Sequence, residues 1–160
     1  MAVSKKLSPG LSPDTAVLFR KAADYCVIQD RCRQEIITKL TYWGADRDES
    51  DSILERLNKE GFLDEKRFAV AYARGKFRNL NWGRIRIIME LKRRNIPQGF
   101  ISLATEEIDQ EEYIETIGKL FRKKMKELRS DTKQNRLKAM RFLAGKGFEL
   151  DLIRKFAKEE

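Results

Sequence analysis

The 160-residue sequence predicts an all-α protein of three tandem three-helix repeats that form an elongated, curved array. Apolar residues follow helical spacing almost throughout, and one short pattern recurs at intervals of about 51 residues. In each copy a leucine follows an apolar residue by three positions and precedes a helix-stopping residue by four. The copies are Ile37/Leu40/Gly44, Ile88/Leu91/Asn95 and Met140/Leu143/Gly147. Such a period indicates one supersecondary unit used three times, and units this small must pack on each other for stability.

Nine helices are therefore expected, in three groups of three. The segment before the first group contains Pro9 and Gly10 and lacks apolar periodicity, which is typical of a chain terminus without fixed structure. The predicted divisions are a flexible N-terminal tail at 1–11 and repeats at 12–61, 62–109 and 110–160.

In the first repeat, Ser12 can cap a helix whose first position is Pro13, where a missing N–H costs nothing. This helix is expected to run to about residue 29, and a second helix to end near Gly44. Acidic residues from position 46 to 51 suit the start of a third helix, because the helix dipole favours negative charge there. The residues at helical spacing in the first two helices are Val17, Leu18, Ala22, Tyr25, Ile28, Ile36, Ile37 and Leu40. Ile53, Leu54 and Leu57 are expected to form the buried face of the third helix.

In the second repeat, Asp64 is expected to cap a helix by accepting a hydrogen bond from an N–H near Arg67. Residues 79–83 break that helix. A second helix carries an apolar stripe and ends at Asn95, and Pro97 begins the third helix. The first helix carries Phe68, Ala69, Tyr72 and Phe77, and the stripe of the second is formed by Ile85, Ile88, Met89 and Leu91. Ile101 and Ala104 of the third helix are expected to face inward.

The third repeat shows the same spacing of apolar residues in three further helices. The residues that show this spacing are Tyr113, Ile117, Leu120, Phe121 and Met125 in the first helix, Leu137, Met140 and Leu143 in the second, and Leu150, Ile153 and Phe156 in the third. Ile101 and Ile153 lie six residues after their helix stops, whereas Ser50 occupies this position in the first repeat. The start of the third helix in the first repeat should therefore rely on Ile53 and Leu54 for its packing.

Composition excludes several classes of function. The chain has no histidine, which removes the commonest general base and the commonest transition-metal ligand. Its two cysteines cannot build a closed zinc site, and the sequence has no phosphate-binding loop, dinucleotide fingerprint or nucleophile elbow. We therefore expect a protein that is not an enzyme and needs no metal or cofactor.

The N-terminus lacks the apolar core of a signal peptide, and no apolar stretch approaches the roughly 18 to 20 residues that span a bilayer. A cytoplasmic protein without membrane contact is expected, and reducing conditions would keep Cys26 and Cys32 as mostly buried thiols. The net charge of +9 predicts attraction to a polyanion such as nucleic acid, or to an acidic protein face.

Charge alternates along the sequence. Residues 41–66 carry a net charge of −4 and residues 67–97 a net charge of +8, followed by −6 over 98–117 and +9 over 118–147. Cations from the two basic blocks could line a common groove and follow a phosphate backbone. The candidate filament- or DNA-binding residues are Arg67, Arg74, Lys76, Arg78, Arg84, Arg86, Arg93, Arg94, Lys119, Arg122, Lys123, Lys124, Lys126 and Arg136.

Two alternatives stay open for these residues. A charge run on a helix is often a solvated face, and acidic neighbours can neutralise it across helices. Trp43 and Trp82 are expected near helix ends, where a tryptophan can stack on a base, although it more often anchors one helix to another.

The middle of the chain contains a series of short motifs: Gly61-Phe62-Leu63-Asp64-Glu65-Lys66-Arg67-Phe68-Ala69, Tyr72, Trp82-Gly83-Arg84-Ile85, Glu90-Leu91-Lys92 and Ile96. Together they resemble the central signature of the bacterial RecX family. Weaker similarity extends the resemblance over roughly residues 16–158. The chain departs from the family pattern at Glu65, where a second aspartate is usual, and at Cys32, where a serine is common. The second change predicts a less securely capped helix start.

The resemblance implies three tandem three-helix repeats, in agreement with the period found above. It also implies a modulator, mainly negative, of the RecA recombinase in homologous recombination and the SOS response. Members bind the RecA–DNA filament groove and restrain ATP hydrolysis, strand exchange and co-protease activity. The expected partners are the RecA filament and single- or double-stranded DNA, and a monomer is expected. The alternative is a stand-alone helical nucleic-acid-binding module.

Overall fold

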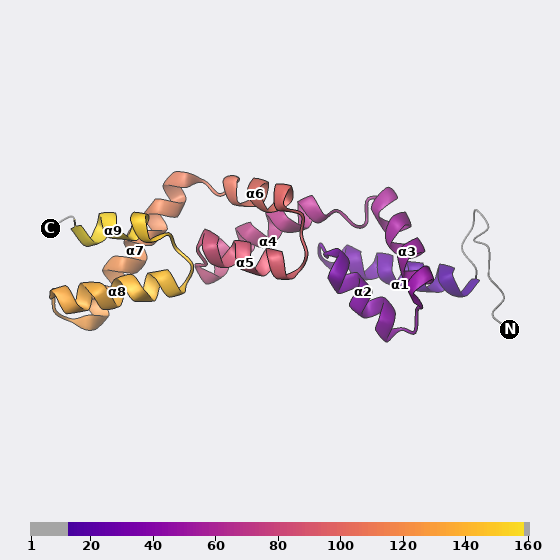
Figure 1. The fold of residues 1–160 in the computed structure, drawn as a ribbon, viewed down its shortest axis with the longest axis horizontal. Helices are drawn as coiled ribbons and strands as arrows, with labels where there is room; N and C mark the ends of the chain where they lie inside the picture. Colours follow the sequence, from indigo (N-terminus) through magenta and orange to yellow (C-terminus); the bar gives the residue numbers. More distant parts are fainter. Residues whose placement is uncertain (1–12, 159–160) are drawn as a thin grey trace. The chain divides into compact units, whose positions relative to one another are not determined.

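The computed structural model describes residues 13–158, and this part of the chain is all helical, with nine α-helices and no strand (Figure 1). The prediction of nine helices is therefore confirmed for the described residues. The predicted flexible tail at 1–11 and the cap at Ser12 lie outside them. The predicted repeat boundaries at 61/62 and 109/110 stay predictions. The chain divides into two compact units, an N-terminal unit, Met1–Phe68, and a C-terminal unit, Ala69–Glu160.

Three helices of the N-terminal unit pack on one another around a single apolar core. They are α1 (Pro13–Ile28), α2 (Arg33–Tyr42) and α3 (Arg47–Lys59). Each helix buries one face, because apolar residues recur every three or four positions. The buried core consists of Ala22, Ala23, Cys26, Ile36, Leu40, Ile53, Leu54, Leu57 and Leu63. Ile53 and Leu54 are fully buried, as expected for a helix that has Ser50 near its start. Both cysteines are buried as predicted, and burial raises the pKa of the Cys26 thiol.

The starts of α2 and α3 differ in how they are capped. At α3 the Glu49 N–H donates to Asp46 Oδ1 at 2.8 Å, and the Asp46 N–H donates to Glu49 Oε1 at 3.5 Å, which completes a capping box. The predicted acidic helix start is thus confirmed. At α2 the N-cap is Cys32, and no side-chain cap hydrogen bond is formed. The Arg33 N–H instead donates to Glu65 Oε2 at 3.3 Å.

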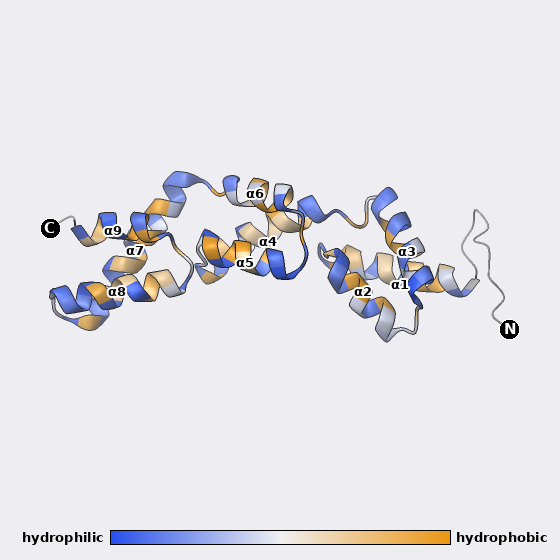
Figure 2. Ribbon diagram, in the orientation of Figure 1, coloured by the Kyte–Doolittle hydropathy of each residue, from blue (hydrophilic) through white to orange (hydrophobic). Residues whose placement is uncertain are grey.

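The C-terminal unit contains most of α4 (Glu65–Leu80) and all of five further helices. These are α5 (Arg84–Arg93), α6 (Gln98–Glu106), α7 (Gln110–Leu128), α8 (Lys133–Gly145) and α9 (Leu150–Lys158). Helix α5 packs on α6, and α7, α8 and α9 pack on one another. Figure 2 shows hydrophobic and hydrophilic residues interspersed along the helices, as expected where one face of each is buried. The predicted cap of α4 is confirmed, because the Arg67 N–H donates to Asp64 Oδ1 at 3.0 Å.

The recurring leucines are equivalent in the structure, and so are the helix stops. Gly44, Asn95 and Gly147 all have positive φ, at 90°, 56° and 94°. In each copy the residue after the stop donates its N–H to the carbonyl of the leucine: Ala45 to Leu40, Ile96 to Leu91 and Phe148 to Leu143. This is the Schellman ending, which requires a left-handed residue at the stop and favours glycine or asparagine there.

In each copy, the buried residue that shares a helix face with the leucine lies one position before the residue that the sequence pattern named. Leu40, Leu91 and Leu143 are fully buried, and so are the residues four positions before them, Ile36, Ile87 and Ala139. By contrast, Ile37 is 39% exposed, while Ile88 and Met140 are only partly buried. Positions three and four residues apart share a helix face, so the sequence pattern alone did not separate them.

The predicted apolar stripe on α5 is confirmed at Leu91 and was wrong at Ile85 and Met89 for the same reason. Ile85 and Met89 are 46% and 50% exposed, and the buried face of the helix is formed by Ile87 and Leu91. The break before α5 is also shorter than predicted, because α4 continues to Leu80.

Candidate functional site

The N-terminus of α5 is held against the turn between α8 and α9. The Gly83 N–H donates to the Lys146 carbonyl at 2.8 Å, and the Ile85 N–H donates to the Gly147 carbonyl at 3.0 Å. The backbones approach so closely that a Cβ on Gly83 would lie 2.2 Å from the Gly147 carbonyl oxygen. The start of α5 leaves the N–H groups of Gly83 and Ile85 without partners inside the helix, and carbonyls of the α8–α9 turn accept their hydrogen bonds. This junction fixes the position of α5 within the C-terminal unit.

A partly buried polar cluster completes the junction. The Arg84 N–H donates to the Tyr113 hydroxyl at 3.0 Å, and that hydroxyl in turn donates to Glu149. The Arg84 guanidinium donates to Glu149 at 3.2 Å and to Gln110 at 2.7 Å, and lies 3.9 Å from the centroid of the Tyr113 ring. Burial, and then the hydrogen bond to Glu149, raise the pKa of Tyr113. Arg84, a predicted binding residue, is therefore engaged in holding the fold, and its side chain is only 18% exposed.

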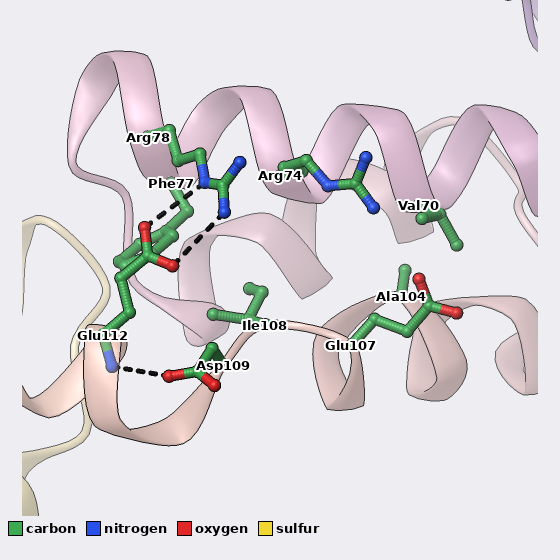
Figure 3. Close-up of a pocket in the computed structure, with 9 residues that line it drawn as sticks. All are labelled: Val70, Arg74, Phe77, Arg78, Ala104, Glu107, Ile108, Asp109 and Glu112. Carbon is green, nitrogen blue, oxygen red and sulfur yellow. Dashed lines mark hydrogen bonds and ion pairs between the residues drawn. The ribbon is translucent and has the colours of Figure 1, made fainter.

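Acidic residues neutralise part of the basic block on α4. Arg78 donates through Nε and Nη2 to the two carboxylate oxygens of Glu112 on α7, both at 3.3 Å (Figure 3). The pair lies in a cleft of about 190 Å³ between α4 and the α6–α7 segment, which Arg74 and Glu107 also line. The Asp109 carboxylate caps α7 through the Glu112 N–H. The alternative of neutralisation across helices thus holds for Arg78.

A cluster of cations and aromatic rings lies where α4 meets α5. The rings of Tyr72 and Trp82 meet edge to face, with centroids 6.4 Å apart. The Lys76 ammonium lies 5.3 Å from the Tyr72 centroid and 5.1 Å from the Trp82 centroid. The Arg86 guanidinium lies 4.2 Å from the Trp82 centroid, and that of Arg94 lies 4.9 Å from the Tyr72 centroid. Cations at these distances are attracted by the ring faces.

Lys146 joins this cluster to a second aromatic ring. Its ammonium donates to the Leu80 carbonyl at 3.3 Å and lies 5.6 Å from the centroid of Phe142, a residue that is 40% exposed. The Lys124 ammonium lies 4.6 Å from the same centroid. We call the whole set the basic–aromatic strip; it consists of Tyr72, Lys76, Trp82, Arg86, Arg94, Lys124, Phe142 and Lys146.

Sequence reasoning found only part of the strip. Lys76, Arg86, Arg94 and Lys124 were predicted as binding residues, and a stacking role was considered for Trp82. Tyr72 was placed on a helix without a binding role, and Phe142 and Lys146 were not considered as site residues. Lys146 precedes the helix stop Gly147, and the repeat period could have marked that turn as a contact surface.

The predicted cations on α5, α7 and α8 that lie outside the strip divide into two sets. Three of them pair with nearby acidic residues: Arg93 with Glu90 at 2.8 Å, Lys119 with Glu115 at 3.7 Å, and Arg136 with Asp131 at 2.6 Å. Within the strip, Lys124 also pairs with Glu127 at 3.4 Å and Arg94 with Glu90 at 3.5 Å. Arg122, Lys123 and Lys126 are exposed on α7. Exposed ion pairs of this kind contribute little to stability and are easily exchanged for another partner.

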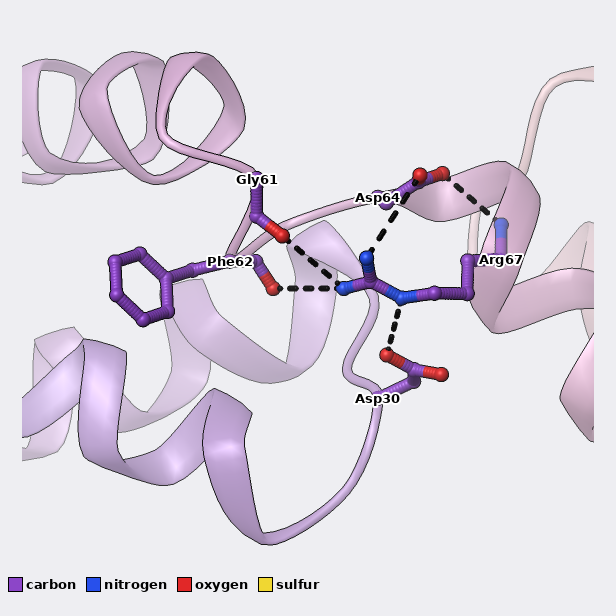
Figure 4. Close-up of polar contacts among 5 residues, drawn as sticks. All are labelled: Asp30, Gly61, Phe62, Asp64 and Arg67. Atoms are coloured by element: carbon purple, nitrogen blue, oxygen red, sulfur yellow. Dashed lines mark hydrogen bonds and ion pairs between the residues drawn. The ribbon is translucent and has the colours of Figure 1, made fainter.

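Arg67 belongs to the N-terminal unit, apart from the strip. Its Nε donates to Asp30 at 2.6 Å, and its Nη2 donates to the carbonyls of Gly61 and Phe62 at 3.2 and 3.4 Å (Figure 4). The hydrogen bond to Asp30 raises the pKa of Arg67. The side chain therefore ties the α1–α2 loop to the α3–α4 loop, which is a structural role.

The N-terminal unit has an aromatic pair that resembles the pair in the strip, with interplanar angles of 83° and 67° respectively. The rings of Tyr25 and Trp43 meet edge to face, also with centroids 6.4 Å apart. Three cations lie over them: Lys21 is 5.7 Å from the Trp43 centroid, and Arg31 and Lys39 are 3.7 and 5.4 Å from the Tyr25 centroid. None of these three cations was predicted, because they lie outside the two basic blocks.

Residues 13–158 contain no group of three or more histidine, cysteine, aspartate or glutamate residues that could hold a metal ion. Among the helices of that range, none combines the length and the apolarity that crossing a membrane requires.

The fold and these surfaces define an all-helical protein of tandem three-helix groups with cation-covered aromatic surfaces. Comparison with known families identifies it further. Residues 64–104 match the second three-helix domain of RecX, and residues 110–156 match the third. The chain belongs to the RecX family.

Individual relatives agree over most of the chain. The regulatory protein RecX of Pseudomonas entomophila is 32% identical over 143 residues, which cover 88% of this chain and 90% of the relative. The regulatory protein RecX of Amycolatopsis mediterranei is 25% identical over 147 residues, covering 89% and 84%. These relatives are named as regulatory proteins, not as enzymes. The crystal structure of RecX from Lactobacillus salivarius has the same fold, with a TM-score of 0.84 at 23% identity, covering 93% of this chain and 97% of that one.

Proposed function

We propose that this protein is a cytoplasmic, mainly negative modulator of the RecA recombinase. It binds in the groove of the RecA–DNA filament and restrains ATP hydrolysis, strand exchange and co-protease activity. Membership of the RecX family supports this proposal, since its members are named as regulatory proteins. The basic–aromatic strip is the observation that carries the choice of a polyanionic partner.

The proposed contacts follow from which cations are available. Arg67, Arg78 and Arg84 are held by acidic partners that are distant in the sequence, and they contribute mainly to the fold. The contact surface is then formed by the strip together with the exposed cations of α7, which are Arg122, Lys123 and Lys126. A chain of net charge +9 is attracted to a negatively charged filament, and several weak contacts on one molecule combine through their high effective concentration.

A charge-reversal experiment tests the proposal. Lys76→Glu with Arg86→Glu reverses two cations of the strip, and Arg154→Glu with Lys155→Glu makes the same change in charge on the exposed face of α9. Both double variants are compared with the parent protein in RecA-dependent strand-exchange and ATPase assays. We expect the strip variant to need about tenfold more protein for half-inhibition, and the α9 variant to stay within about twofold of the parent.

Two outcomes would count against this function. If a saturating amount of the parent protein leaves the rate of RecA strand exchange unchanged, the protein does not have the proposed regulatory role. Equal effects of the two double variants would show that only net charge matters and that the strip is not the contact surface. A salt series addresses the alternative of a stand-alone nucleic-acid module, which would bind DNA tightly without RecA and with a steep dependence on salt.

A further inference from the structure

Both tryptophans of the chain lie in the same local arrangement, although one belongs to each compact unit. Trp43 meets Tyr25 and Trp82 meets Tyr72, in each case edge to face with centroids 6.4 Å apart. Three cations cover each pair. They are Lys21, Arg31 and Lys39 in the first unit, and Lys76, Arg86 and Arg94 in the second.

This arrangement selects a ligand with two properties. The ring faces favour a flat π system, and the cations around them favour negative charge. An unpaired nucleotide offers both, because its base can stack on a ring while its phosphate meets a cation. We infer that Tyr25–Trp43 and Tyr72–Trp82 form two stacking sites for unpaired bases of single-stranded nucleic acid. This inference rests on the proposed function and specifies the class of ligand that the two aromatic pairs bind.

The cations need not be lost when a base stacks. Lys76 and Lys39 are long, flexible side chains whose ammonium groups lie more than 5 Å from the ring centroids. A base that approaches a ring displaces the ammonium, which then pairs with the adjacent phosphate. Arg86 is exposed and lies closer to its ring, so its planar guanidinium can itself carry a base on its outer face.

Duplex nucleic acid lacks one of these two properties. Its phosphates are accessible, but its base faces are covered by neighbouring bases, and a base must be flipped out before a tryptophan can stack on it. The sites should therefore bind a strand with exposed base faces more tightly than a strand that offers phosphate charge alone.

The test uses the full chain and two oligomers of equal length, oligothymidylate and an abasic deoxyribose-phosphate oligomer. Intrinsic tryptophan fluorescence is followed during titration of the parent protein and of two single-tryptophan variants. Trp43→Phe reports on Trp82, and Trp82→Phe reports on Trp43. We expect oligothymidylate to quench the fluorescence of all three proteins and to bind about tenfold more tightly than the abasic oligomer.

Equal affinity and equal quenching with the two oligomers would overturn the inference, and this comparison needs only the parent protein. Quenching in Trp43→Phe alone would show that Trp43 is not a stacking site. Quenching in Trp82→Phe alone would show that Trp82 is not one. Strand exchange measured on the same preparation keeps the two proposals apart. Inhibition of RecA without base-dependent binding would remove the stacking sites alone, whereas base-dependent quenching without any effect on RecA would remove the regulatory function alone.

Discussion

Replacing Gly83 by alanine tests the junction between α5 and the α8–α9 turn. The φ of Gly83 is −78°, which alanine adopts without strain, so only the close approach forbids a side chain. The new Cβ would lie 2.2 Å from the carbonyl carbon and oxygen of Gly147 and 2.3 Å from the Phe148 nitrogen. All three atoms belong to the backbone, so no rotation of a side chain relieves the clash.

The expected cost follows from what must separate. Moving the two backbones apart lengthens the hydrogen bonds from Gly83 to Lys146 and from Ile85 to Gly147, each worth about 1 kcal/mol net. Forcing a methyl group into a packed contact adds about 1 to 3 kcal/mol. The free energy of unfolding should therefore fall by roughly 3 to 5 kcal/mol. For a unit of this size the melting temperature should fall by roughly 15 °C or more.

Thermal unfolding followed by far-UV circular dichroism measures this change, and Gly75→Ala supplies the control. Gly75 lies inside α4, and the nearest atom to an added Cβ would be Asn79 Nδ2 at 3.9 Å, an ordinary contact. Alanine there should raise stability by about 0.5 to 1 kcal/mol, because glycine is unfavourable inside a helix. A Gly83→Ala protein that melts within about 2 °C of the parent would refute the reasoning, as would two glycine variants that shift in the same direction.

Two further predictions concern a helix cap and an alkaline transition. Asp46→Ala removes the capping box with Glu49 and should lower the free energy of unfolding, measured in urea, by about 1 kcal/mol. The control Asp51→Ala, at an exposed position of the same helix, should change this free energy by less than about 0.5 kcal/mol. Equal effects of the two variants would contradict a stabilising role of the cap. Burial raises the pKa of Tyr113 in the folded state, so above the unfolded value near 10 the unfolded chain loses a proton that the folded chain keeps, and stability falls by up to about 1.4 kcal/mol per pH unit. Tyr113→Phe should lose this part of the alkaline slope while being less stable at neutral pH, and an unchanged slope would show that Tyr113 does not cause it.

Local features of the fold were predictable from the sequence, because their causes lie within a few residues. Gly44, Asn95 and Gly147 end their helices through a left-handed backbone that few other residue types adopt easily. The cap at Asp64 likewise depends on an amide only three residues away. The number and order of the helices followed from such signals, together with the period of the apolar residues.

The tertiary structure decided which of several equivalent residues faces the core. Ile36 and Ile37 are adjacent isoleucines, and both lie close enough to the face of Leu40 to satisfy a helical pattern. Only the packing of three helices together buries the first and leaves the second 39% exposed. The same uncertainty placed Ile85 and Met89 in the apolar stripe of α5, whereas the buried face is formed by Ile87 and Leu91.

The sequence by itself determined that the chain is helical, repetitive and basic, since composition and spacing are properties of the chain alone. The roles of the individual cations were decided by the tertiary structure. Arg84 and Arg86 are two residues apart, yet Arg84 pairs with Glu149, 65 positions away, while Arg86 lies over the ring of Trp82. The physical reason is that a cation is neutralised by whichever acidic side chain folding brings within a few ångströms, and that distance is not a property of the local sequence.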